Sequence, residues 1–197
     1  SGSALKSNFN FKIKKKFFNI GYFGSLYKSR GFDLILRLSN IDKQNKYFVY
    51  GNLNQVSNLK QNSIPKNLKI NNHIPYKNIS TILKKMDILL MPYTSSITVS
   101  GNISDITNYT SPLKLFDYLS SGKIIICSDF KVLKEVIKEN KNAIFVKNYK
   151  NLFSWKNEIL KLKNQLPKQL IMSKNNFILS KKFSLKERAK LILDKIC

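Results

Sequence analysis

The sequence has few of the residues from which easily recognised sites are built. It contains two cysteines, Cys127 and Cys197, and a single histidine, His73. Two cysteines do not indicate a disulfide framework, and they fit a reducing cytoplasm. One histidine argues against a histidine-based metal site and against a Ser/His/Asp or Cys/His catalytic set. We therefore expect neither a structural metal nor a histidine-driven nucleophile.

Arginine is also scarce, although the chain is strongly basic. Only Arg30, Arg37 and Arg188 are arginines among 35 basic residues, against 11 acidic residues, and the formal net charge is +24. Arginine is the usual reader of phosphates and base edges, so this lysine-borne charge is weak evidence for nucleic acid. Abundant lysine, asparagine and isoleucine are also what an AT-rich genome imposes. Peripheral contact with an anionic membrane is the partner hypothesis that the charge leaves open.

Long apolar runs are absent as well. No segment is long enough to span a bilayer, and no signal peptide is recognisable. We expect a cytoplasmic location, with association at the inner face of the cytoplasmic membrane as an option. Residues 1–16 are interpreted as a cloning remnant followed by a basic linker. One domain is expected over residues 17–197, a length that can bury a core.

What the chain does contain is a regular alternation of apolar strands and amphipathic helices. Strands are predicted at 17–24, 46–51, 68–74, 87–92, 123–128 and 143–146. Helices are predicted at 32–39, 79–85, 111–121 and 132–139, and from 152 to the end with a break near Pro167. This order predicts an α/β fold, a Rossmann-like doubly wound parallel sheet of about six strands with helices on both faces. Ligands of such sheets bind at the carboxyl ends of the strands.

The segment from Thr110 to Asp129 is the most informative stretch. Ser111 suits an N-cap, and an apolar stripe of the following helix leaves Lys114 and Asp117 on the opposite face. A helix start offers free N–H groups and a positive dipole end, which favour a phosphate. Lys114 would add charge there, and Asp117 would accept from sugar hydroxyls. The same pattern also describes an ordinary capped helix with solvated polar groups.

Two further loops follow predicted strands. In the first, Gly24 closes a strand and Arg30 can clamp a diphosphate with two hydrogen bonds. In the second, residues 73–77 (HIPYK) could hold a base by backbone hydrogen bonds and stacking. Each loop can equally be a plain turn. There is no Walker pattern and no G-x-G-x-x-G.

Taken in order, several segments resemble one known family. They are IGYFGSLYKSRGFDLIL, FVYGN, ILKKMDILLMPY, SPLKLFDYLSSGKIIICSD, VLKEVIKENKNAIFV and FSLKERAKLIL. Together, over roughly residues 17–193, they resemble the C-terminal, donor-binding domain of a GT-B glycosyltransferase of family 4 type (glycosyl transferases group 1). The resemblance implies one half of a GT-B fold.

The resemblance also implies roles for individual residues. Arg30, helped by Lys28, binds the diphosphate of the donor, because Ser25 stands where the family often has an arginine for this purpose. The family's signature has two acidic residues. Asp117 stands at the second, in place of the ribose-binding glutamate, whereas Tyr109 stands at the first, and Asp105 in the same loop is the candidate substitute. Arg30 and Lys114 stabilise the leaving group, and no other catalytic residue is assigned. The implied donor-binding residues are Gly24, Ser25, Lys28, Arg30, His73, Ile74, Tyr76, Tyr109, Ser111, Leu113, Lys114 and Asp117.

The implied activity is that of a retaining hexosyltransferase in polysaccharide biosynthesis. The donor is a nucleoside-diphosphate sugar, the acceptor is a glycan or a lipid-linked sugar, and neither a cofactor nor a metal is expected. The isolated chain should be inactive without its N-terminal GT-B domain. Three alternatives remain: a basic nucleic-acid-binding α/β domain, a noncatalytic sugar-nucleotide-binding domain, and a GT-B-shaped epimerase or hydrolase.

Overall fold

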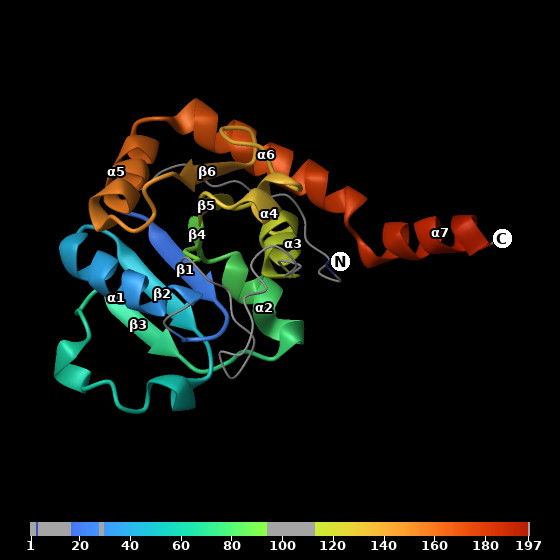
Figure 1. The fold of residues 1–197 in the computed structure, drawn as a ribbon. Coiled ribbons are helices and arrows are strands. Elements are labelled where there is room, and N and C mark those ends of the chain that lie inside the picture. The colour runs from blue at the N-terminus through green and yellow to red at the C-terminus, as the bar shows by residue number, and fades with distance from the viewer. Residues whose placement is uncertain (1–2, 4–16, 28–29, 94–112, 197) are drawn as a thin grey trace.

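The computed structural model describes residue 3 and residues 17–27, 30–93 and 113–196. Its centre is a six-stranded parallel sheet in the order β3-β2-β1-β4-β5-β6 (Figure 1). The predicted fold class is therefore confirmed. The strands are β1 (Asn19–Phe23), β2 (Lys46–Tyr50), β3 (Leu68–Asn71), β4 (Ile88–Met91), β5 (Ile124–Ser128) and β6 (Ala143–Val146).

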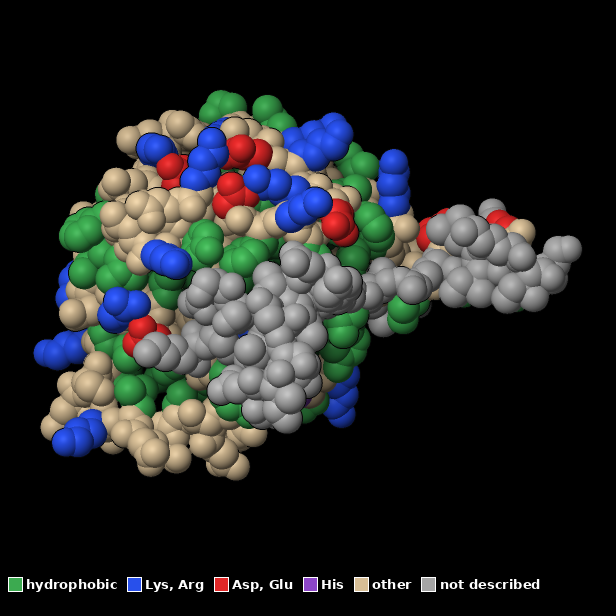
Figure 2. Space-filling view, in the orientation of Figure 1, with side chains coloured by type: hydrophobic (Ala, Val, Ile, Leu, Met, Phe, Trp, Pro, Cys, Tyr) green, Lys and Arg blue, Asp and Glu red, His purple; other side chains and the backbone are tan. Residues whose placement is uncertain are grey.

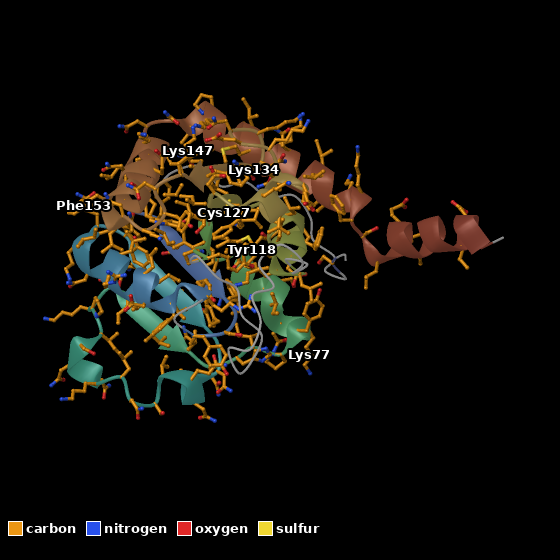
Figure 3. All side chains as sticks on the ribbon, viewed as in Figure 1. Lys77, Tyr118, Cys127, Lys134, Lys147 and Phe153 are labelled. Carbon is orange, nitrogen blue, oxygen red and sulfur yellow. The ribbon has the colours of Figure 1, made fainter. Side chains whose placement is uncertain are left out.

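Helices cover both faces of the sheet, because its central strands are apolar on both sides. In β5, Ile124 and Ile126 face one apolar cluster, whereas Ile125 and Cys127 face the other. Helices α1 (Phe32–Ile41) and α5 (Leu152–Lys163) pack on the first cluster. Helices α2 (Tyr76–Leu83), α3 (Leu113–Ser120) and α4 (Lys131–Lys134) pack on the second. Figure 3 shows Cys127 deep inside the domain, where its side chain is fully buried.

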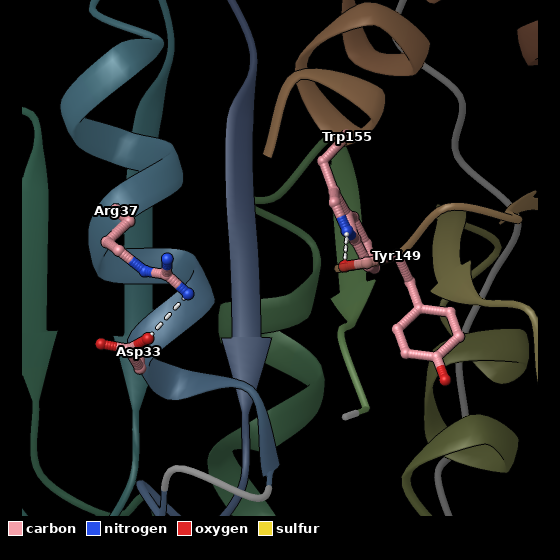
Figure 4. A network of polar contacts seen from close by, with 4 residues as sticks. All are labelled: Asp33, Arg37, Tyr149 and Trp155. Atoms are coloured by element: carbon pink, nitrogen blue, oxygen red, sulfur yellow. Dashed lines mark hydrogen bonds and ion pairs between the residues drawn. The ribbon is translucent and has the colours of Figure 1, made fainter. Parts of the chain in front are cut away.

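Two polar contacts in Figure 4 show how the helices on the first face are stabilised. Asp33 and Arg37, one turn apart on α1, form an exposed ion pair of 2.9 Å. The indole Nε1 of Trp155, on α5, donates to the carbonyl oxygen of Tyr149 at 2.9 Å. Trp155 is fully buried, so this bond joins the loop after β6 to the core. The exposed pair contributes little, whereas the tryptophan anchors α5.

Two predicted helices, at 79–85 and 132–139, have other boundaries in the structure. Helix α2 begins at Tyr76, because Pro75 takes the N-cap position. Helix α4 ends at Lys134 rather than at 139, since the chain turns through Val136 and reaches a left-handed residue at Asn140. The predicted helix break near Pro167 is confirmed: α5 ends at Lys163 and α6 (Leu166–Lys182) begins at Leu166, with the proline accepted in its first turn.

Helix α7 (Leu185–Ile196) follows α6 and projects away from the body of the domain (Figure 1). At the α6–α7 junction, the backbone N–H of Ser3 donates to Phe183, and the Ser3 carbonyl accepts from Leu185. Ser3 lies in the segment interpreted as a remnant and linker, so at least this residue contacts the domain. Within the described ranges, no helix combines the length and apolar content that crossing a bilayer requires.

Candidate functional site

The candidate site lies where the strand order changes direction. Strands β1 and β4 are neighbours at the centre of the sheet, but β1 leads outward to β2 and β4 leads outward to β5. The carboxyl ends of two such strands are where open α/β sheets bind ligands. Here the loop of residues 24–31 follows β1, and α3 begins after the connection from β4. These are two of the three segments that the sequence singles out.

Lys114, in the first turn of α3, has an unusual environment for a cation. Its Nζ lies 4.5 Å from the ring centre of Tyr22 and 5.3 Å from that of Tyr93. Among the described residues it forms no ion pair. Burial, followed by the nearby positive charge of Arg30, lowers the pKa of Lys114 from 10.5 to about 7. The aromatic faces partly compensate the ammonium, but an anion would compensate it more fully.

Tyr22 and Tyr93 form a cradle under Lys114 that sequence reasoning missed. Both are buried, and burial raises the pKa of each phenol, so both are neutral at physiological pH. The Tyr22 hydroxyl lies 2.7 Å from the carbonyl oxygen of Ser25 and 3.2 Å from that of Arg30. The tyrosine therefore supports the loop that carries Arg30. The available signal was positional: each tyrosine lies at or just beyond the carboxyl end of its strand.

Glycines allow the β1 loop to pack closely on its neighbours. Gly31 has a φ of 85°, and a Cβ at this position would stand 1.8 Å from the carbonyl oxygen of Pro92. A Cβ at Gly51 would stand 2.3 Å from the carbonyl oxygen of Gly24. At Gly24 itself, a Cβ would stand 2.9 Å from the Nζ of Lys114. The loop thus has little room for side chains, and its backbone lies beside the lysine.

Asp117 lies one turn further along α3 and is partly buried. Its Oδ1 accepts from the Tyr76 hydroxyl at 2.9 Å and from the Ser3 hydroxyl at 2.6 Å. Burial raises the pKa of Asp117, while these two hydrogen bonds oppose that rise. Tyr76 belongs to the third segment that the sequence singles out, at the start of α2. The structure therefore brings this segment and the Asp117 carboxylate together. No sequence pattern predicted this hydrogen bond between Tyr76 and Asp117.

The remaining residues predicted to bind the donor differ in their exposure and in their contacts. Leu113, the first residue of α3, is 62% exposed. Ser25 and His73 are exposed. The backbone N–H of His73 donates to the side-chain oxygen of Asn72 at 2.8 Å. Ile74 packs on the apolar cluster under α3. Four residues fall outside the described residues, and their roles stay predictions: Lys28, Asp105, Tyr109 and Ser111.

Two further residues that Figure 3 labels show where the site ends. Tyr118 lies in the interior, where its hydroxyl accepts from the backbone N–H of Phe23, whereas Lys77 lies at the outer edge of α2 (Figure 3). In the part of the chain that the structure describes, no three His, Cys, Asp or Glu side chains are grouped to hold a metal ion. Of the candidate site residues that the structure describes, three are charged: the cations Arg30 and Lys114 and the carboxylate Asp117.

The sequence and the fold place the chain in a known class. Residues 5–177 match the family model of the glycosyl transferases group 1, so the chain belongs to this family. No curated protein matches the chain significantly.

Solved structures share the fold at low sequence identity. HepE of Anabaena, solved with UDP-glucose, has a TM-score of 0.71 at 15% identity, and the match covers 91% of this chain and 48% of HepE. Sucrose-phosphate synthase of Thermosynechococcus elongatus has a TM-score of 0.70 at 12% identity, covering 91% and 44%. WaaG, a glycosyltransferase involved in lipopolysaccharide biosynthesis, has a TM-score of 0.62 at 16% identity, covering 90% and 47%. The chain thus spans about half the length of these proteins.

Proposed function

We propose that this chain is the C-terminal, donor-binding half of a retaining GT-B glycosyltransferase of family 4 type. In this proposal the whole enzyme transfers a hexose from a nucleoside-diphosphate sugar to a glycan or a lipid-linked acceptor. The isolated half binds the donor but does not transfer the sugar efficiently, because the N-terminal domain with its acceptor site is missing.

One observation carries the proposal: Lys114 and Asp117 extend from the same helix end, at the switch point of the sheet. A nucleoside diphosphate has an anionic diphosphate and, several ångströms away, a ribose with two hydroxyl donors. Lys114 supplies an ammonium without a carboxylate partner among the described residues, and Asp117 supplies a hydrogen-bond acceptor. The spacing of one helical turn suits adjacent parts of a single nucleotide.

The proposed chemistry relies on electrostatics at the leaving group. As the glycosidic bond breaks, negative charge grows on the departing diphosphate, and Arg30 and Lys114 stabilise it. The backbone N–H groups of Leu113 and Lys114, at the positive end of α3, add to this stabilisation. The proposal includes no metal and no cofactor, because these cations supply the positive charge that a metal ion would.

The neighbours support particular choices of donor and acceptor. HepE was solved with UDP, with UDP-glucose, and with UDP and glucose. We therefore propose a uridine nucleotide as the donor's leaving group. WaaG acts in lipopolysaccharide biosynthesis. By analogy we propose a surface polysaccharide or glycolipid as the product, made in the cytoplasm at the inner face of the membrane.

A calorimetric comparison tests the proposal against its main alternative. The chain is titrated with UDP, GDP, ADP and a short DNA duplex at low and high salt. The proposal predicts saturable binding of one nucleoside diphosphate, with a modest salt dependence. A basic nucleic-acid-binding domain would instead prefer the duplex, and its affinity would fall steeply with salt. That result would refute the donor-domain proposal.

A further inference from the structure

Helix α6 has its polar and apolar faces inverted relative to a normal surface helix. Four of its side chains face inward at helical spacing and are buried, and three of them are polar: Gln169, Met172, Ser173 and Asn176. A surface helix usually turns its apolar stripe toward the core. The buried polar groups are hydrogen-bonded. Asn176, for example, donates to the carbonyl oxygen of Lys123 at 2.9 Å.

The outward face of α6 carries exposed apolar side chains. Leu170, Ile171 and Ile178 are 41%, 56% and 48% exposed. Isolated exposed apolar residues are normal on protein surfaces, but here three of them share one stripe on a helix that buries polar groups. Figure 2 shows hydrophobic and lysine side chains together along the upper edge, where Figure 1 places α6. A partner that removed these apolar side chains from water would therefore gain hydrophobic free energy.

The lysines between these apolar residues indicate what that partner is. Lys174, Lys181 and Lys182 lie on the same stripe, and all three are exposed. Within the described residues none of them forms an ion pair. From residue 147 to residue 182 the sequence has nine lysines and one acidic residue, Glu158. The surface around the stripe is therefore strongly positive.

This composition fits a lipid surface better than a protein or a nucleic acid. Protein interfaces are enriched in arginine and depleted in lysine. The stripe has three lysines and no arginine, and Lys181 lies 5.4 Å from the ring centre of Phe177 on the same helix. Exposed leucine and isoleucine gain nothing from a sugar–phosphate backbone. A lysine can lay its aliphatic stem along an apolar boundary and keep its ammonium among polar headgroups, so lysines beside aliphatic side chains suit a membrane interface. There the aliphatic groups enter the acyl boundary, and each ammonium meets an anionic headgroup.

We propose that the outward face of α6, formed by Leu170, Ile171, Lys174, Ile178, Lys181 and Lys182, docks on a membrane surface that contains anionic lipid. This inference rests on the proposed function only for the location of the enzyme. None of these six side chains is one of the candidate site residues, so docking and nucleotide binding are measured as separate quantities.

Vesicle co-sedimentation tests the inference. The chain is mixed with vesicles of phosphatidylcholine alone or of phosphatidylcholine with phosphatidylglycerol. One variant carries Lys174→Gln, Lys181→Gln and Lys182→Gln. The matched control carries Lys60→Gln, Lys66→Gln and Lys69→Gln, which remove the same charge from exposed positions near β3. A second variant, Ile171→Asn with Ile178→Asn, removes apolar contact at constant charge. UDP affinity and thermal unfolding are measured for each protein.

The expected result is sedimentation with the anionic vesicles only. Each lysine near an anionic surface strengthens binding about fivefold, so the α6 lysine variant should lose about 100-fold and the control much less. The isoleucine variant should also bind more weakly, and UDP affinity should not change. Equal losses in the two lysine variants would overturn the inference. So would equal binding to neutral vesicles, or a DNA duplex that displaces the vesicles and depends on the same three lysines.

Discussion

Lys114 is the residue whose charge state links the fold to the proposed ligand. Its ammonium contacts two tyrosine rings and lies near Arg30, and both its burial and this second cation favour the neutral amine. A diphosphate bound beside Lys114 would reverse that preference, because an adjacent anion favours the protonated amine. The lysine should therefore gain a proton when the ligand binds.

This reasoning predicts a pH dependence with a definite sign. At pH 8, above the free pKa of about 7, most Lys114 side chains are neutral before binding and charged afterwards. UDP binding should therefore take up close to one proton, and affinity should fall as pH rises from 7 to 9. Calorimetry in buffers of different ionisation enthalpy measures this uptake. Lys114→Met should abolish it, and wild-type binding without proton uptake would contradict the prediction.

Residue by residue, the sequence predicted members of the candidate site but not the contacts between them. Lys114 and Asp117 could be selected, because a helix start after a long loop has a recognisable pattern. The tyrosine cradle and the Tyr76–Asp117 hydrogen bond could not, because they join residues far apart in the chain. Such contacts depend on which strands are neighbours, and a local pattern does not contain that information.

At the scale of elements, the close approach of the β1 loop to the end of β4 depends on Gly31. Gly31→Ala would place a left-handed alanine against the Pro92 carbonyl, where the built Cβ stands 1.8 Å away. The left-handed conformation alone costs about 1–3 kcal/mol for a residue other than glycine, and the clash adds to this. We expect a loss of at least about 2 kcal/mol in urea unfolding. Ser57→Ala, in an exposed turn, is the control, and equal stabilities would contradict the account.

The inverted packing of α6 gives a second prediction at this scale. Asn176 donates to Lys123 and accepts from Asn142 at 3.2 Å, so Asn176→Ala leaves polar groups unsatisfied in the interior. The expected cost is about 1–3 kcal/mol. Asn175→Ala removes only an exposed hydrogen bond to Lys141 and should change stability by less than about 0.5 kcal/mol. Thermal unfolding of both variants measures these losses of stability. Similar losses in the two variants would contradict the view that the hydrogen bonds of the buried polar face stabilise α6.

The sequence predicted the strands well and the shorter helices less well. Apolar β-branched runs such as residues 124–126 define their own strands, and all six described strands overlap the predicted ones. Helix α4 was predicted too long, because its apolar spacing continues after the backbone has turned. The orientation of α6 escaped notice, because apolar residues lie both on its inward side, as Met172 does, and on its outward side, so the sequence does not mark which face is inward.

At the scale of the whole molecule, our proposal is that sugar transfer requires an N-terminal domain in addition to this one. Arg30→Ala, made in a protein that also carries the N-terminal domain, should reduce turnover about 10²–10³-fold, as expected for the loss of a group that stabilises transition-state charge. Arg37→Ala is the matched control, because Arg37 is exposed and pairs only with Asp33 among the described residues. Steady-state kinetics with a nucleotide-sugar donor gives the comparison. Equal turnover in the two variants would remove Arg30 from the mechanism.

The most direct test of the account is the affinity of this chain for UDP before and after the loss of one carboxylate. Calorimetry compares the wild type with Asp117→Ala and with Asp33→Ala, which removes a carboxylate from an exposed ion pair on α1. Hydrogen bonds to a charged acceptor contribute about 1.5–3 kcal/mol, so Asp117→Ala should weaken binding at least about tenfold. Asp33→Ala should bind UDP as the wild type does. If Asp117→Ala binds UDP unchanged, the nucleotide does not lie at α3, and the proposed donor site is wrong.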